Sequence, residues 1–550
     1  MSTRQSTPQS GQHAATTGSP LGRSRVAVFG LAAVAGAAER LAEGGVRHWQ
    51  LSDAASTGPA HPLAHLWGWE AVGVPASAVF ARVLPRRVAD PAALTFGALP
   101  PLDEAHYDDL RVALTADRPD LLLGGGDAAT LLLLGRLARD LDLPAVLVAF
   151  PATASPRAVV LALLPGDGGN GRDVADLAAY LNGAPLGDPA NDLNTPERRL
   201  DWQDTNLHAA ALARLLLLGA AAAPADLGRI VFGARRTLLV QGAAGWPWRV
   251  QYVDLARATP LTLPALAPVP LGRQSARGPI LVVGCGRIGS QAARSLLAAG
   301  ATPALALIEG GRVDAGDLSG AFYTADQIGK NRADALAQQL IRIALKPRTT
   351  PEWTPAAFTD DWSGLQRASG DWCFTQVPRD AKPGPWFESL LDTLRPVAVI
   401  LALGPYEDGR LARVLRDKGV PHVVSRCAAD GAWFEALVVD GSRGPCRECL
   451  QAGALPIVGA PTATSIETGR AANLVARLAW QLSLDPAARA PWFARLLAEE
   501  QTALMGWSGT AGGAAGAAGD APGQVGVRGL PAGAGPCPEC RYRAAERLVI

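Results

Sequence analysis

Three glycines with the spacing G-x-G-x-x-G are the residues of this chain best suited to bind a phosphate: Gly284, Gly286 and Gly289. An apolar run at 280–283 precedes them, and 290–299, which is rich in Ala and Leu, follows them. These patterns predict a buried parallel strand and a helix, with the glycines in the turn between them. Glycines in such a turn let the backbone approach a phosphate, and the start of the helix supplies free N–H groups.

An acidic residue completes this unit. A second apolar run, 304–308, ends at Glu309. At this point of a Rossmann unit, an acid can accept a hydrogen bond from a ribose hydroxyl. We therefore predict a nucleotide-type Rossmann fold. Whether a nucleotide occupies it is a separate question, because the same fold can be retained as a scaffold.

Four cysteines form a second candidate site, as two C-x-x-C pairs: Cys446 with Cys449, and Cys537 with Cys540. Four thiolates suit tetrahedral zinc, and four protein ligands leave no open position for catalysis. We predict a structural zinc that holds the C-terminus against the domain body, with two redox dithiols as the alternative. The other cysteines are expected to be half-buried thiols rather than nucleophiles: Cys285, Cys373 and Cys427.

Composition narrows the classes of protein to consider. A chain of 550 residues is too long for one ordinary core. A net charge of +1 with 18% charged residues gives no basic surface for nucleic acid. No long apolar run is free of polar breaks, so we expect no membrane span. The polar start of the chain lacks the apolar segment of a signal peptide, and the paired cysteines favour metal binding in a reducing cytoplasm.

A weaker copy of the glycine unit lies at 25–53. An apolar strand, Gly30, an Ala-rich helix and a second strand lead there to Asp53. Ala32 and Ala35 stand at the second and third glycine positions, where a Cβ crowds the close approach that a phosphate requires. We predict that this copy keeps the fold and has lost the ligand.

The repeat continues beyond the two glycine units. Residues 119–148 and 396–424 share the order strand, loop, helix, strand. The predicted fold class is therefore α/β, with two Rossmann-like domains in tandem, each a mostly parallel sheet flanked by helices, the second with the zinc clamp. Other predicted elements are a helix at 206–218, strands at 237–241 and 249–255, and an amphipathic helix at 464–482.

This organisation divides the chain into six parts. We expect a disordered tail (1–24), a degenerate Rossmann domain (25–260), a Pro-rich linker (261–277), a nucleotide-binding Rossmann domain (278–505), a flexible Gly/Ala-rich loop (506–535) and a C-terminal zinc-binding segment (536–550).

A Rossmann unit, a polar segment with a lysine after its second strand, and paired C-x-x-C motifs together resemble the ThiF/MoeB/HesA superfamily, the bacterial side of the ubiquitin-activating enzymes. The likeness covers roughly 278–550 and, more faintly, 25–260. It implies binding of ATP and magnesium, and attachment of AMP to the C-terminal carboxylate of a small ubiquitin-like or sulfur-carrier protein, or of a peptide. Relatives often act as pairs of such domains, so the chain resembles a fused pair, an internal pseudo-dimer.

The resemblance carries over onto individual positions. Gly284, Gly286 and Gly289 match the ATP loop, and Glu309 stands where the family usually has an aspartate for the ribose. Asp317 takes the place of the family asparagine, and Lys330 matches the lysine of its VGKxKA segment.

Other positions depart from the family pattern. The family arginine falls on Gly320 and its glutamine on Ala321. The two strand-end aspartates fall on Leu401 and Gly404, with Asp408 nearby but shifted. Adenylation needs positive charge and metal to stabilise the phosphoryl charge, so these losses predict slow turnover. The remaining candidates are Lys330 and Arg332 as cations, and Asp314, Asp317 and Asp408 as metal ligands, with Lys330 and Asp408 as the proposed catalytic residues.

Two functions stay open on this pattern. One is ATP-dependent adenylation of a carrier or peptide C-terminus, carried by the glycine loop, Glu309 and Lys330. The other is a catalytically inactive ThiF-like protein that presents a peptide or carrier to a tailoring enzyme in azoline-type peptide biosynthesis, favoured by Gly320, Ala321 and Gly404. A nicotinamide oxidoreductase is a third reading, which the paired cysteines disfavour because such a domain has no need of a zinc clamp.

Overall fold

The computed structural model describes a large part of the chain on both sides of the predicted linker. The described residues are 20–53, 55–58, 62–150, 158–163, 195–218, 236–243, 246–254, 276–301, 305–309, 311–343, 385–403, 405–427, 433–441, 465–490, 493–494, 497, 502–508 and 526–528.

The first half is built on a mixed sheet. Its strands are β1 (Arg25–Phe29), β2 (His48–Ser52), β3 (Thr95–Ala98), β4 (Leu121–Gly125), β5 (Ala145–Ala149), β6 (Ala158–Leu163), β7 (Arg236–Ala243) and β8 (Trp246–Asp254). They lie in the order β3-β2-β1-β4-β5-β6-β7-β8. The strands from β3 to β5 pair in parallel, and β6, β7 and β8 continue the sheet antiparallel.

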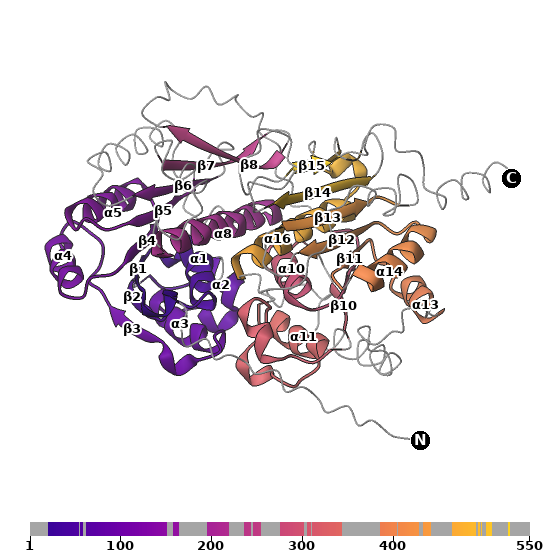
Figure 1. The fold of residues 1–550 in the computed structure, drawn as a ribbon, viewed down its shortest axis with the longest axis horizontal. Coiled ribbons are helices and arrows are strands. Elements are labelled where there is room, and N and C mark those ends of the chain that lie inside the picture. The colour runs from indigo at the N-terminus through magenta and orange to yellow at the C-terminus, as the bar shows by residue number, and fades with distance from the viewer. Residues whose placement is uncertain are drawn as a thin grey trace, which may run out of the picture.

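The second half repeats this plan. Its strands are β9 (Ile280–Val283), β10 (Leu305–Ile308), β11 (Ala398–Leu401), β12 (His422–Cys427), β13 (Trp433–Val439), β14 (Thr502–Ser508) and β15 (Gly526–Arg528). Their order is β10-β9-β11-β12-β13-β14-β15, parallel as far as β12 and antiparallel beyond it. With β3 set aside, the two sheets have the same strand order and the same directions (Figure 1).

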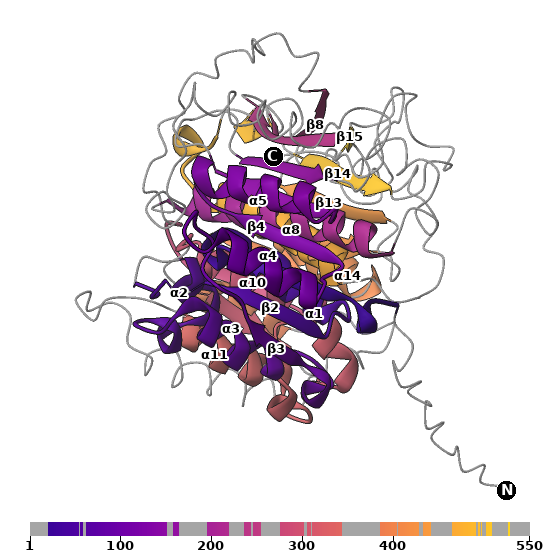
Figure 2. The ribbon, with the colours of Figure 1, turned by 90° about the vertical axis from the view of Figure 1, so that its left-hand side faces the viewer.

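Helices cover both faces of each sheet. In the first half they are α1 (Leu31–Glu43), α2 (Pro62–Trp67), α3 (Ala76–Val83), α4 (Tyr107–Ala116), α5 (Ala128–Asp140) and α8 (Pro196–Leu218). In the second half they are α10 (Arg287–Ala298), α11 (Arg332–Ile343), α13 (Pro385–Leu394), α14 (Pro405–Asp417) and α16 (Ser465–Ser483). Figure 2 shows α4 and α5 in front of the first sheet. The α/β class with two mostly parallel, helix-flanked sheets is therefore confirmed.

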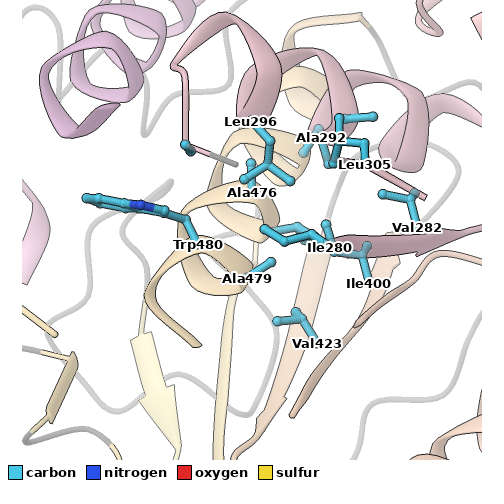
Figure 3. Close-up of a cluster of buried hydrophobic side chains, with 14 of the residues drawn as sticks. Ile280, Val282, Ala292, Leu296, Leu305, Ile400, Val423, Ala476, Ala479 and Trp480 are labelled. Atoms are coloured by element: carbon cyan, nitrogen blue, oxygen red, sulfur yellow. The ribbon is translucent and has the colours of Figure 1, made fainter. Parts of the chain in front are cut away.

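Alternation along the strands explains the layers. In β9, Ile280 and Val282 join the core under α10 and α16, whereas Leu281 and Val283 join the core under α13 and α14. Both faces of a parallel strand are thus apolar, as expected for a strand covered on both sides. Figure 3 shows the first of these cores, where Leu296 of α10 and Ala476 of α16 lie over Ile280.

Helices from both halves pack against each other, and α2 also packs on α11. Helix α1 packs on α8, α10 packs on α16, and α8 packs on α16 across the middle of the molecule (Figure 1). The cores also interlock: Leu200 of α8 is buried in the core of the second half, and Ile466 of α16 is buried in the core of the first half.

Several predicted elements differ in extent from the observed ones. Helix α8 begins at Pro196, ten residues before the predicted 206–218 helix. Helix α16 matches the predicted 464–482 helix but is buried on its polar positions too, because it lies against its own sheet, α10 and α8. Strand β15 falls inside the stretch predicted as a loop (506–535), where it pairs with β14. The short 3-10 helix η1 (Pro20–Arg23) falls inside the predicted tail, and Leu21 is buried.

Candidate functional site

The three glycines between β9 and α10 have three different surroundings. Gly284 has a φ of 91°, and a Cβ there would lie 2.5 Å from the carbonyl oxygen of Ala402. Gly289 lies against the turn itself, since a Cβ there would be 1.8 Å from the carbonyl oxygen of Gly284. Gly286, the N-cap of α10, has no described atom within 4 Å of the position its Cβ would take. Gly284 thus makes the turn, Gly289 allows the helix to contact the loop, and Gly286 faces open space. A phosphate-binding loop requires these three roles.

Glu309 ties the end of β10 to this loop. Its half-buried carboxylate accepts hydrogen bonds from the N–H of Cys285 at 3.0 Å and from the N–H of Gly311 at 2.8 Å. A carboxylate has about four lone-pair sites, so acceptor capacity remains after two such bonds. The residues present therefore fit a ribose hydroxyl beside an open phosphate loop.

The first half has the same link between acid and loop. Asp53 accepts from the N–H of Leu31 at 2.7 Å and from the N–H of Ala55 at 3.1 Å. Burial raises the pKa of Asp53, against the lowering effect of these two bonds. The carbonyl of Ala32, at the second glycine position, accepts from the indole N–H of Trp202 at 3.2 Å. The acid of this half is thus retained as a brace for the loop.

Beyond Glu309, the short 3-10 helix η5 (Ala315–Ser319) carries the next predicted site residue, Asp317. Its carboxylate accepts from the N–H of Asp314, and Asp314 in turn caps the start of η5. Arg332 at the start of α11 donates to both oxygens of Asp317, at 2.9 and 3.1 Å. Burial raises the pKa of Asp317, and Arg332 offsets this in part. Asp317 and Arg332 therefore form a braced ion pair.

The backbone of Lys330 is fixed by two hydrogen bonds, whereas its side chain is exposed. Its N–H donates to Gln327 and its carbonyl accepts from Val313. Its side chain is 46% exposed, with Nζ at 4.0 Å from Asp326 Oδ2. The structure thus brings Glu309 to the glycine loop and pairs Asp317 with Arg332, while the ammonium of Lys330 lies beside Asp326.

Hydrogen bonds fasten the η5 segment to the start of α10. Tyr323 donates its hydroxyl to the carbonyl of Cys285, and Ser290 accepts from the N–H of Phe322 at 3.0 Å. Gln291 donates to the carbonyl of Gly320 at 3.2 Å. These bonds therefore fix the stretch that follows η5 against the glycine loop and the first turn of α10.

Arg287 is a residue of this part of the site that sequence reasoning missed. It follows Gly286 as the first residue of α10, and its Nη2 donates to the carbonyl of Gly316 at 3.3 Å and to the hydroxyl of Ser319 at 3.2 Å. Its position between the second and third glycines of the motif could have identified it from the sequence.

Cys285 was predicted to be a half-buried thiol without a nucleophilic role, and it is more deeply buried than predicted. It is fully buried, and burial, followed by the charge of Glu309, raises its pKa well above the usual range. A thiol in that state is a poor nucleophile at neutral pH because it stays protonated.

Several predicted site residues lie outside the described part of the chain: Cys446, Cys449, Cys537, Cys540, Cys373 and Gly404. Asp408 belongs to α14, and Cys427 to β12, but their side chains are outside the described atoms. Among the residues that the structure describes, no cluster of three or more His, Cys, Asp or Glu side chains could hold a metal ion.

One comparison with known protein families covers the part of the chain that holds these residues. Residues 271–356 match the ThiF family. The match contains the glycine loop, Glu309, Asp317, Lys330 and Arg332.

Other comparisons are weaker. No curated protein matches the chain. Among solved structures, E. coli MccB with succinimide aligns with a TM-score of 0.27 and 13% identity, over 48% of this chain and 65% of the MccB chain. This chain thus spans less than two thirds of that protein, and a TM-score of this size carries no functional argument. Within the described helices, none is both long and apolar enough to cross a membrane.

Proposed function

We propose that this protein is a ThiF-like protein that binds ATP in its second half and adenylates the C-terminal carboxylate of a small ubiquitin-like or sulfur-carrier protein, or of a ribosomal peptide. The observation that carries the proposal is the glycine loop, whose Gly286 faces open space inside the stretch that matches the ThiF family.

The reaction would need little covalent chemistry from the protein. A carboxylate oxygen of the substrate attacks the α-phosphorus of ATP, the bond from that phosphorus to the bridging oxygen breaks, and pyrophosphate leaves. The loop N–H groups at the start of α10 would hold phosphate oxygens, and Glu309 the ribose. Magnesium would accompany ATP, with Asp314, Asp317 and Asp408 as its candidate ligands, although both oxygens of Asp317 already accept from Arg332. Lys330 and Asp408 are the candidate catalytic residues.

Catalysis in this proposal is impaired. Gly320 and Gly404 stand where the family resemblance implies an arginine and an aspartate. Loss of one donor that stabilises a transition state typically costs about 100- to 1000-fold in rate. Two losses in one site need not add, but a slow enzyme is the expectation.

A second candidate is a catalytically inactive ThiF-like protein that presents a peptide or carrier to a tailoring enzyme. The geometry at Gly320 favours it, since a Cβ at that position would lie 3.3 Å from Cδ of Arg287 and 3.2 Å from Oγ1 of Thr468. A side chain at this position would therefore require the side chains of Arg287 and Thr468 to shift by a few tenths of an ångström.

We also propose that the chain is a fused pair of ThiF-like domains whose first copy has lost its ligand. The matching strand orders support this proposal, as do the shared links from Asp53 and Glu309 to their loops. Partner binding in the cytoplasm, without nucleic acid or membrane, remains part of the proposal.

Structural zinc completes the proposal. Four thiolates are the donor set that zinc prefers in closed structural sites. We expect about one zinc per chain by elemental analysis. The double variant Cys446→Ser with Cys537→Ser should lose it, whereas Cys285→Ser, which alters the thiol buried under the loop, should keep it. Less than about half an equivalent in the unaltered protein would contradict zinc binding.

Pyrophosphate exchange tests the main proposal. The full chain is mixed with magnesium, ATP, labelled pyrophosphate and candidate carrier proteins or precursor peptides, and label entering ATP is measured. Exchange that depends on one substrate supports adenylation. A turnover of about one per second would contradict impaired catalysis. Absence of exchange, with tight binding of one carrier or peptide, supports the presenting role instead.

A further inference from the structure

Both backbone groups of Cys285, in the glycine loop, have side-chain partners from other segments. Its N–H donates to Oε2 of Glu309 at 3.0 Å, and its carbonyl accepts from the hydroxyl of Tyr323. The two bonds act on the two peptide units that flank Cys285, and each of these units is planar. Two side chains from outside the loop therefore set the orientation of the loop at this residue.

The peptide unit between Cys285 and Gly286 has a polar group on each side. In a trans peptide, the carbonyl of the first residue and the N–H of the second point in opposite directions. The carbonyl of Cys285 points to Tyr323, which is 1% exposed and belongs to the core of the second half. The N–H of Gly286 therefore points away from Tyr323 and from that core.

Glycine at position 286 makes this orientation reversible unless another group fixes it. Turning the peptide over would change the φ of Gly286 from −70° to a positive value, which glycine adopts at little cost. The reversed peptide would present the carbonyl oxygen of Cys285, which repels a phosphate, in place of an N–H that binds one. The hydrogen bond from Tyr323 selects the orientation that suits an anion.

Tyr323 is held in place and keeps its proton. The N–H of the preceding residue, Phe322, donates to the hydroxyl of Ser290 at 3.0 Å. Burial raises the pKa of the Tyr323 hydroxyl well above its usual range, so the group remains a donor at neutral pH. Its oxygen also lies 3.3 Å from the carbonyl oxygen of Arg332, but the single hydroxyl proton serves the closer carbonyl of Cys285.

We propose that Tyr323 is a positioning residue of the nucleotide site, which holds the peptide before Gly286 so that its N–H faces a bound phosphate. The proposal rests on the proposed ATP binding and deepens it, because it names the side chain that orients a phosphate-binding group. Tyr323 acts through the loop and does not touch the nucleotide. Its hydroxyl should therefore affect the affinity for ATP and leave the affinity for adenosine unchanged.

The first test is calorimetry of the full chain with Mg-ATP and with adenosine. Tyr323→Phe removes only the hydroxyl and should weaken ATP binding about tenfold, with adenosine binding within about twofold. The number of adenosine sites per chain shows how much of the variant is folded. The matched control is Tyr107→Phe in the first half, whose buried tyrosine donates to Oδ2 of Asp140 at 3.0 Å. It should bind both ligands as the unaltered protein does.

Hydrogen exchange of the ligand-free protein gives a second readout. Amide exchange within residues 285–290 should be faster in Tyr323→Phe, because a loop that can turn over breaks the bonds from the N–H of Cys285 to Glu309 and from the N–H of Ser290 to Gly286. Exchange of the same residues in Tyr107→Phe should match that of the unaltered protein.

The outcomes separate this proposal from the proposed function. ATP affinity of Tyr323→Phe within about twofold of the unaltered protein would overturn the role of Tyr323 and leave ATP binding standing. Equal losses for ATP and adenosine, or unchanged exchange at 285–290, would also overturn it, because the hydroxyl would then not act on the phosphate loop. Failure of the unaltered protein to bind ATP would overturn the proposed function, and the role of Tyr323 with it.

Discussion

Gly286 and Gly289 differ in what surrounds the side chain that each lacks. A Cβ at Gly286 meets no described atom within 4 Å, whereas a Cβ at Gly289 would meet the carbonyl of Gly284 at 1.8 Å. Gly286 also has a φ of −70°, which alanine adopts without strain. An alanine substitution should therefore affect ligand binding at Gly286 and packing at Gly289.

Two single substitutions test this difference. Gly286→Ala should leave the free energy of unfolding within about 0.5 kcal/mol of the unaltered protein, and it should weaken ATP binding at least about tenfold. Gly289→Ala should destabilise by about 1–3 kcal/mol or more, because helix α10 must move off the loop. Chemical denaturation and calorimetry measure both effects. Unchanged ATP affinity in Gly286→Ala would contradict a phosphate site at this loop.

At the scale of elements, the ends of β2 and β10 carry equivalent acids. Asp53 and Glu309 each accept two backbone N–H groups, one of them from the loop before the next helix. An acid in this position closes the turn between strand and helix in both halves. These hydrogen bonds are sufficient to explain why both halves have an acid at this position. A role of Glu309 in binding a ligand therefore needs a separate test.

Matched amide variants provide that test. Asp53→Asn and Glu309→Gln each leave one backbone N–H facing an amide NH₂, so each should destabilise by about 1–3 kcal/mol. Glu309→Gln should in addition weaken ATP binding, and Asp53→Asn should not. Urea denaturation and calorimetry on both proteins decide between the roles. Equal ATP affinities in the two variants would show that Glu309 is a brace without a ribose contact.

Some elements were predictable because local pattern determines them. The apolar run and the glycine spacing predicted β9 and the turn to α10 to within a few residues. The start of α8 was not predicted because residues 196–205 are polar. Charged side chains in this stretch contact the other half of the molecule. Asp201 and Asp204 there bind Arg477 of α16 at 2.6 and 3.1 Å. No periodicity within one helix reveals a partner more than 270 residues away.

The candidate site shows the same limit. The glycine loop and Glu309 could be predicted, because the motif spans one strand, one turn and one helix. The contact between Arg287 and Gly320 could not, because it depends on how η5 folds back onto α10. Position 320 was therefore interpreted from the sequence as a loss, although the structure places another arginine against it.

At the scale of the whole molecule, a buried charge cluster joins the halves. Glu39 of α1 accepts from Arg294 of α10 at 2.8 Å and pairs with Arg87 at 3.1 Å. Burial opposes ionisation of Glu39, but Arg294, Arg87 and Arg40 outweigh it and lower its pKa to about 2. The guanidiniums of Arg87 and Arg294 lie 4.0 and 4.4 Å from the ring of Phe322. Loss of the Glu39 charge should therefore destabilise the contact between the two halves.

Glu39→Gln should destabilise the protein by about 3–5 kcal/mol, because it leaves buried arginines without their counter-charge. The control is Glu70→Gln, whose glutamate pairs with Arg86 at 3.3 Å while both side chains are nearly half exposed. That surface pair should contribute no more than about 1 kcal/mol. Thermal and urea unfolding at pH 7 measure both. Equal effects would contradict a structural role for the buried cluster.

His208 of α8 links the stability of the whole molecule to pH. It is buried, and burial, followed by the charge of Arg470 on α16, lowers its pKa to about 3. The unfolded chain titrates this imidazole near its ordinary value of about 6.5. Between these two values the unfolded state binds a proton that the folded state does not, so stability falls as the pH falls below about 6.5, by up to about 1.4 kcal/mol per pH unit.

His208→Leu removes this titration and keeps an apolar side chain of similar size in the buried position. The free energy of unfolding should therefore fall less steeply with acidification in this variant than in the unaltered protein. Between about pH 6.5 and 4.5 other buried groups contribute too. Burial lowers the pKa of His422 to about 4 and raises the pKa of Asp204 to about 8. The contribution of His208 is therefore the difference between the curves of the variant and the unaltered protein, because these other groups are present in both. Parallel stability curves for the two proteins across this window would mean that His208 is protonated inside the folded protein, and that the joint between α8 and α16 admits the charge.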